Sequence, residues 1–184
     1  MAHPIKHFCT ITRHRHKVIA HCRKAGIFWQ GLRHDLSKYS PTEFIPGARY
    51  YAGDHSPNEE ERKLKGYSKA WLHHKGRNRH HFEYWQDAIP KEKKPLAPVE
   101  MPLKYVVEMF CDRVAASKIY KGAAYTDRSP WEYYEPNKDR LPIHPSTKAL
   151  LEEWLIMLVE KGESATFSHI RSVVKKSKKG HKKL

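Results

Sequence analysis

Residues 31–43 read GLRHDLSKYSPTE, and this stretch contains the features from which both the fold and the site are predicted. His34 and Asp35 place an imidazole beside a carboxylate, and Lys38 follows about one helical turn later. A neutral His nitrogen and an Asp oxygen are ordinary ligands of transition metals. Because such dipeptides also recur by chance on surfaces, the meaning of this pair depends on further inward-facing ligands.

The end of the same stretch is typical of a helix start. Ser40 stands at the N-cap position, Pro41 at the first helical position and Glu43 at the third, which is the pattern of a capping box. The pattern recurs as SPNE at 56–59 and SPWE at 129–132. Alternating runs of β-branched residues are scarce. The sequence therefore predicts an all-α fold.

Helical spacing of apolar residues and the breaks between them predict the order of elements. Loops are expected at 47–55 and in the Pro/Lys-rich segment 90–102. Helices are expected at 5–25, about 27–32, about 57–81, 103–120, 147–161 and 166–175. We expect a single helical domain over residues 1–174 and a basic flexible tail over residues 175–184.

Composition limits the class of protein. The 184 residues are 39% hydrophobic and 11% aromatic, which fits one folded domain. A net charge of +15 favours anionic partners, including nucleic acid, nucleotides or a membrane surface, but says nothing about the fold. No signal peptide and no apolar run of about 18 residues is found, so we expect a soluble cytoplasmic protein without membrane contact. Cys9, Cys22 and Cys111 are expected to be buried free thiols in a reducing compartment.

The first predicted helix carries an inward-facing histidine. His14 lies on the apolar stripe between Ile11 and Val18, whereas His16 lies about 200° away round the helix, beside Lys17. We expect His14 to point into the protein. It is either a metal ligand or a core histidine with an ordinary hydrogen bond.

Residues 73–81 read HHKGRNRHH and form the densest histidine cluster of the chain. In a continuous helix His74, Asn78 and His81 would share a face, and a break at Gly76 would let His80 turn inward as well. The basic residues between them favour a solvated patch, while the flanking aromatic residues favour a partly buried one. Contact with a metal or substrate and a solvated surface both stay open.

The helix at 103–120 carries a carboxylate on a partly buried stripe. Asp112 has Ala115 and Ala116 beside it, which leaves space next to its side chain. A buried carboxylate needs a partner, which is either an Arg or a metal ion. Glu108, one turn earlier, is expected to orient a ligand.

Taken in order, His14, His34-Asp35, His74, His80-His81 and Asp112 resemble the HD-domain superfamily of metal-dependent phosphohydrolases. The segment from His34 to Lys38 looks like the His-Asp-x-x-Lys form found where two metals are bound. More narrowly, GLRHDLSKYSPTEF, AWLHHKGRNRHHFEYW and EMFCDRVAAS resemble an HD-like family of bacterial and phage proteins with no established function. The resemblance covers residues 5 to about 135.

Two features depart from the HD pattern. The interval between His14 and His34 is shorter than in many HD enzymes, and His74 and His81 are close in sequence instead of lying on well-separated helices. His16 and His73 therefore stay alternative ligands.

The resemblance implies an HD-domain-like helical bundle that hydrolyses the phosphate ester of a nucleotide or related small molecule through a metal-activated water. It implies one or two divalent transition metal ions (Fe, Mn, Co, Ni or Zn) with Asp35 between them. Asp35 and Lys38 would be catalytic, and Lys38, Arg77 and Asn78 would bind the substrate. The implied metal ligands are His14, His34, Asp35, His74, His80, His81 and Asp112.

Two other functions stay open. HD-type di-iron oxygenases use the same ligand set to activate O₂, and consumption of oxygen would distinguish them. A non-catalytic nucleic-acid-binding protein is suggested by the net charge, with weak contact through the basic tail.

Overall fold

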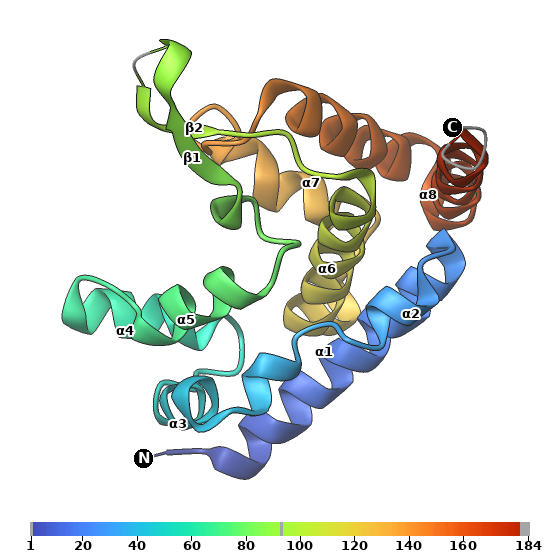
Figure 1. The fold of residues 1–184 in the computed structure, drawn as a ribbon. Coiled ribbons are helices and arrows are strands. Elements are labelled where there is room, and N and C mark those ends of the chain that lie inside the picture. The colour runs from blue at the N-terminus through green and yellow to red at the C-terminus, as the bar shows by residue number, and fades with distance from the viewer. Residues whose placement is uncertain (1, 93, 181–184) are drawn as a thin grey trace.

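The computed structural model describes residues 2–92 and 94–180, and these residues are mostly helical (Figure 1). The prediction of an all-α fold is confirmed. The elements are α1 (Pro4–Ala25), α2 (Phe28–Gly31), α3 (Pro41–Arg49), α4 (Pro57–Lys65), α5 (Lys69–Arg77), β1 (Gln86–Ile89), β2 (Lys94–Pro98), α6 (Leu103–Lys121), α7 (Ser129–Tyr134) and α8 (Pro145–Gly180).

The hydrophobic core lies where α1, α6 and α8 meet. Helix α6 runs through the middle of the molecule, with α1 on one side and α7 and α8 on another (Figure 1). α1 contributes Val18 and Cys22, and α6 contributes Phe110, whose ring meets that of Trp154 from α8 edge-on at 6.0 Å. The predicted apolar stripes of these helices are the buried ones, since burying apolar surface is the main favourable term in folding.

Helices α3, α4 and α5 form a second group beside the N-terminal half of α1 (Figure 1). The expectation of one helix over 57–81 is wrong, because the chain breaks between α4 and α5. Gly66 ends α4 with φ 77°, a conformation that glycine adopts without strain, and the Oγ of Ser68 caps α5 by accepting from the backbone N–H of Trp71. Gly76 does not break α5, which ends at Arg77.

The segment expected to be a loop at 90–102 contains part of a small hairpin. β1 and β2 pair antiparallel, with Gln86 opposite Pro98 and Asp87 opposite Ala97. The prolines of this segment concealed the strand, because proline is tolerated at the edge of a sheet where its missing N–H leaves no bond unmade. The hairpin is a small addition to an otherwise helical molecule.

Helix α8 contains a sharp change of direction at Gly162. This residue has φ 75° and ψ 173°, a conformation essentially restricted to glycine. The carboxylate of Asp127 accepts from the backbone N–H of Glu163 at 3.2 Å and so caps the second half of the helix. The two predicted helices are therefore present, and the second continues to Gly180 instead of ending near Lys175. The remainder of the predicted tail, residues 181–184, lies outside the described residues.

One smaller expectation, the burial of all three cysteines, needs revision. Cys22 and Cys111 are buried free thiols, as expected, but Cys9 is exposed. Within 2–92 and 94–180, none of the helices combines the length and the apolar character needed to cross a membrane.

Glu163 connects three helices through its carboxylate. Oε1 lies 2.5 Å from the Nζ of Lys24 on α1, and Oε2 pairs with the Nζ of Lys118 on α6. Burial raises the pKa of Glu163, but the hydrogen bonds from the two ammonium groups outweigh it and lower the pKa to about 2. This carboxylate is therefore charged in the folded protein over almost the whole accessible pH range.

We predict that Glu163→Gln lowers the free energy of unfolding at pH 7 by about 1–2 kcal/mol, the range for losing charged hydrogen bonds. Because the folded-state pKa is depressed, the stabilisation is full above the ordinary pKa of 4.5 and is lost as the pH falls towards about 2. Urea unfolding at pH 7 and pH 3 measures it. Glu160→Gln, an exposed neighbour, should show no such change, and an equal loss in both variants would contradict the assignment.

Candidate metal centre

The His34–Asp35 pair lies in a short loop held closely against α1. Gly31, the last residue of α2, packs so tightly that a Cβ there would lie 2.6 Å from the Cβ of Cys22. The Nε of Arg15 donates to the carbonyl oxygen of His34 at 3.2 Å, and the same guanidinium donates to a second carbonyl of the loop. Asp35 has φ 52°, an uncommon conformation for a residue other than glycine. The loop thereby turns both side chains inward, where each residue is 1% exposed.

Around this loop the structure brings together a first cluster, which consists of His14, His34, Asp35 and Asp112. Helix α1 supplies His14 and helix α6 supplies Asp112. The Nε2 of His14 lies 2.9 Å from the Oδ1 of Asp112. The Nε2 of His34 lies 3.4 Å from the same oxygen and 3.2 Å from the Oδ2 of Asp35.

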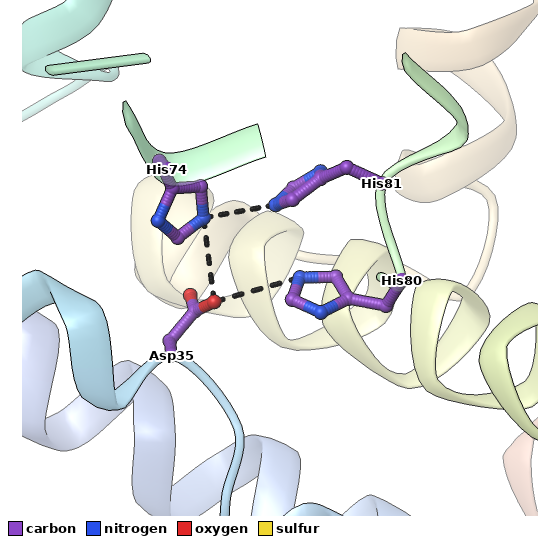
Figure 2. A group of neighbouring side chains, drawn as sticks. All are labelled: Asp35, His74, His80 and His81. Carbon is purple, nitrogen blue, oxygen red and sulfur yellow. Dashed lines mark hydrogen bonds and ion pairs between the residues drawn. The ribbon is translucent and has the colours of Figure 1, made fainter. Parts of the chain in front are cut away.

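A second cluster on the other side of Asp35 consists of Asp35, His74, His80 and His81. Figure 2 shows the three imidazole rings pointing towards one another and towards the carboxylate. The Nε2 of His74 lies 3.3 Å from the Oδ1 of Asp35 and 2.9 Å from the Nε2 of His81. The Nε2 of His80 lies 3.5 Å from the same Asp35 oxygen. Each oxygen of Asp35 therefore faces one cluster.

The spacing within both clusters suits a metal ion. Two ligand atoms about 2.1 Å from a common ion lie about 3.0 Å apart at a right angle and about 3.4 Å apart at the tetrahedral angle. The separations of 2.9–3.5 Å agree with these values. Each buried cluster could hold a metal ion.

Two glutamates fix which nitrogen faces the centre in three of the rings, those of His34, His74 and His80. The Oε1 of Glu108 lies 2.9 Å from the Nδ1 of His34 and 3.4 Å from the Nδ1 of His80. The Oε2 of Glu43 lies 2.7 Å from the Nδ1 of His74. Since a carboxylate only accepts hydrogen bonds, Nδ1 carries the proton, and in a neutral ring Nε2 presents its lone pair to the cluster.

This arrangement leaves an excess of electron pairs at the centre. The Nε2 atom of His80 and the Oδ1 of Asp35 are buried and make no hydrogen bond with other described residues, and the Nε2 of His34 faces only carboxylate oxygens. The ammonium of Lys38, 2.6 Å from the Oδ2 of Asp35, offers a positive charge on one side only. Converging lone pairs and carboxylate oxygens repel unless protons or cations lie among them, so the donor set fits a metal.

Protons take part of that role in the protein without a metal. Burial lowers the pKa of His34, but the carboxylate of Asp35 outweighs it and raises the pKa well above 6.5. Burial and the ammonium of Lys38 lower the pKa of His14, and burial lowers that of His81 well below 6.5. A metal ion would therefore compete with a proton at His34 while finding the other two rings neutral, and its binding should weaken as the pH falls.

The three residues predicted to contact substrate occupy different positions. The side chain of Lys38 is 28% exposed and sits at the edge of the centre. Arg77 is exposed, and its guanidinium makes no hydrogen bond within the described part of the chain. The amide of Asn78 donates to the Oγ of Ser37 at 2.8 Å and to the carbonyl oxygen of His74 at 2.9 Å, so it is engaged within the protein.

The alternative ligands lie outside both clusters. The Nδ1 of His73 is 2.6 Å from the Oε1 of Glu43. His16 is exposed on the outward side of α1, whereas His14 is 7% exposed. The predicted inward orientation of His14 is confirmed.

Glu43 was missed as a residue of the centre because its position predicts a capping role. Helix α3 does begin at Pro41, but the capping-box prediction there is wrong, since no side chain caps this end. The carboxylate of Glu43 contacts His73 and His74 of α5 instead.

The start of α7 also differs from its predicted cap. Ser129 is the first residue of the helix, with Arg128 at the N-cap, and its Oγ accepts from the backbone N–H of Thr126. At α4 the serine of the predicted capping box does cap the helix, because the Oγ of Ser56 accepts from the backbone N–H of Asn58, but Glu59 makes no return bond to the N–H of Ser56 in the described structure.

Comparison with known families gives one result. A family model described as "Family of unknown function (DUF5662)" matches residues 3–157. The chain belongs to this family. All residues of the two clusters described above fall within the matched residues. The second half of α8 lies beyond them. No curated protein and no solved structure matches the chain.

We predict that variants will separate the two clusters by metal content. His14→Ala should impair the first cluster and His81→Ala the second, so each variant should retain metal only in the other. Asp35→Ala should lose metal from both, because Asp35 belongs to both. The measurement is elemental analysis after incubation with Mn²⁺, Fe²⁺ or Zn²⁺ and gel filtration, on protein purified without a chelating tag.

His169→Ala, which removes a histidine of α8 far along the chain from both clusters, is the matched control. Circular dichroism should show the same helix content in all variants. Wild-type protein that takes up no stoichiometric transition metal would refute the centre. Equal metal content in the wild type and Asp35→Ala would refute the shared ligand.

Proposed function

We propose that this chain is a metal-dependent phosphohydrolase of the HD type that acts on a nucleotide or a related phosphate ester. The observation that carries the proposal is the division of the Asp35 carboxylate, with Oδ2 facing His34 at 3.2 Å and Oδ1 facing His74 at 3.3 Å. A carboxylate shared in this way suits two neighbouring divalent ions, which are common in enzymes that hydrolyse phosphate esters. The order of the ligands along the chain supports the same class.

In this proposal the side chains of each cluster hold one ion. His14, His34, Asp35 and Asp112 would hold the first, and Asp35, His74, His80 and His81 the second. A mixed set of imidazole and carboxylate ligands suits iron, manganese, cobalt, nickel or zinc better than magnesium. Bound there, such ions supply Lewis acidity towards a phosphoryl group and lower the pKa of a water molecule.

Lys38 is the residue we assign to the substrate phosphate. Its ammonium now compensates the charge of Asp35 at 2.6 Å, and that carboxylate raises the pKa of Lys38 although burial lowers it. Lys38 therefore stays charged at every physiological pH. Once a divalent cation compensates Asp35, the ammonium can turn to an anion at the partly exposed edge of the centre.

Tyr120 of α6 is near enough to the centre for its charges to act on the hydroxyl. Burial raises the pKa of this hydroxyl above 10; the ammonium of Lys38 lowers the pKa and the carboxylate of Asp112 raises it. The hydroxyl thus keeps its proton at neutral pH and can donate a hydrogen bond. A cation and a neutral donor near the centre suit an anionic substrate.

The test is release of inorganic phosphate from p-nitrophenyl phosphate and from a panel of nucleotides by protein loaded with Mn²⁺, Fe²⁺ or Co²⁺. We expect Asp35→Ala to abolish turnover. Lys38→Ala should lower kcat/KM by about 10- to 100-fold, the usual effect of removing one preorganised charge from a phosphoryl site, and should keep its metal. Lys17→Ala, an exposed lysine of α1, should leave kcat/KM unchanged.

Three results would count against the proposal. Metal-loaded protein that releases no phosphate from any substrate, but consumes O₂ with iron, would point to a di-iron oxygenase instead. Activity that survives Asp35→Ala would place the chemistry elsewhere. Equal activity of Lys38→Ala and wild type would remove Lys38 from the reaction.

A further inference from the structure

A basic depression lies between the C-terminal end of α1 and the second half of α8, which are neighbours at one end of the molecule (Figure 1). The larger part has a volume of about 610 Å³ and the smaller part about 380 Å³, and Arg171 lines both. His16 lines the depression, whereas His14 points into the metal centre from the other side of α1. The depression is therefore distinct from that centre.

The cations of this depression are mostly uncompensated. No carboxylate lines either part. Lys24 pairs with Glu163 at 2.5 Å, and the Nζ of Lys178 donates to the carbonyl oxygen of Gly26 at 3.2 Å. The remaining cations are exposed and, within the described residues, have no hydrogen-bond or ion-pair partner; they are Arg23, Arg171, Lys175 and Lys179.

Helical periodicity aligns these charges. Arg171, Lys175, Lys178 and Lys179 stand at spacings of four, seven and eight residues along α8. Such residues share one face of a helix and form a stripe about 12 Å long, at about 1.5 Å per residue. A stripe of cations without carboxylates is complementary to a chain of phosphates.

Two aromatic side chains of α2 lie at or next to the depression, where Phe28 shares its lining with Arg171. Phe28 lines the depression, and Trp29, the next residue, is 73% exposed. Their rings meet edge-on with centroids 5.4 Å apart, which leaves the indole supported by a neighbour and open to solvent. An exposed tryptophan in contact with a residue that lines a basic depression offers a surface on which an unpaired base can stack.

We propose that this depression binds single-stranded nucleic acid, with phosphates along the cations of α1 and α8 and a base stacked on Trp29. A duplex would offer phosphates but no free base face to the indole. A membrane would require several large apolar side chains at one level, whereas Ile5 and Phe8, the exposed large apolar side chains of α1, stand at its opposite end. The proposal is independent of the metal centre and of its proposed chemistry.

The experiment measures fluorescence anisotropy of a labelled 20-nucleotide oligo(dT) with the full-length protein in the presence of a chelator. Binding should fall with salt with a slope of about −2 to −3 in log K against log salt, as expected for three or four phosphate contacts on a single strand. Trp29→Ala should weaken binding by about 5- to 100-fold, the usual effect of losing one stacked base. Tyr67→Ala, which removes another exposed aromatic ring, should not weaken it.

Charge reversal distinguishes binding of the oligonucleotide at the stripe from its general attraction to a positively charged protein. Arg23→Glu/Arg171→Glu should weaken binding by more than 10-fold compared with Arg49→Glu/Arg140→Glu, which changes net charge equally on other surfaces. All four positions are exposed, and circular dichroism checks that each variant folds. Equal losses in the two double variants would overturn the proposal in favour of non-specific attraction.

Two further probes distinguish the source of the phosphates. Binding of a matched 20-base-pair duplex as tight as that of oligo(dT), with no effect of Trp29→Ala, would overturn the stacking role. Binding to vesicles containing one quarter phosphatidylglycerol, lost in Trp29→Ala, together with no binding of oligo(dT), would identify a lipid surface instead.

Discussion

Burial of the Asp35 carboxylate is the constraint around which this molecule is arranged. A carboxylate that is 1% exposed must be compensated, and the groups that face it come both from its own loop and from a segment distant in sequence. His74 approaches one oxygen from α5, while His34 and Lys38 approach the other from the same loop. Arg15 of α1 fixes the backbone of that loop through two carbonyl oxygens. The packing of α1 against α3 and α6, and of α5 against α3, thus also determines the geometry of the charged centre.

Helical periodicity was sufficient to predict that His14 and not His16 faces inward from α1 and that Asp112 lies on a partly buried face of α6. Both follow from local rules, because the side chains of one helix divide between core and solvent at a fixed period. The break at Gly66 also agrees with local rules, since Gly66 can end one helix and Ser68, two residues later, can cap the start of the next. The break was not predicted because the apolar residues 70–72 were interpreted as a continuation of the same helix.

Contacts between distant elements could not be read in the same way. The partnership of Glu43 with His74 depends on how α3 packs on α5, and the place of His80 depends on a turn that follows α5. The sequence around Glu43 satisfied a local pattern so well that its tertiary role was concealed. The hairpin β1–β2 was missed because its prolines outweighed a weak strand signal.

The kink at Gly162 has a consequence for how this chain can vary. The second half of α8 starts from a point fixed by the glycine conformation and by the Asp127 cap, and Arg171 follows at a set number of residues. Deleting one residue between Gly162 and Arg171 would rotate the following side chains by about 100° about the helix axis. Lysine content, net charge and helix propensity would be almost unchanged, yet the cations would leave the depression and apolar residues would turn to solvent. The length of this segment is therefore more constrained than its composition.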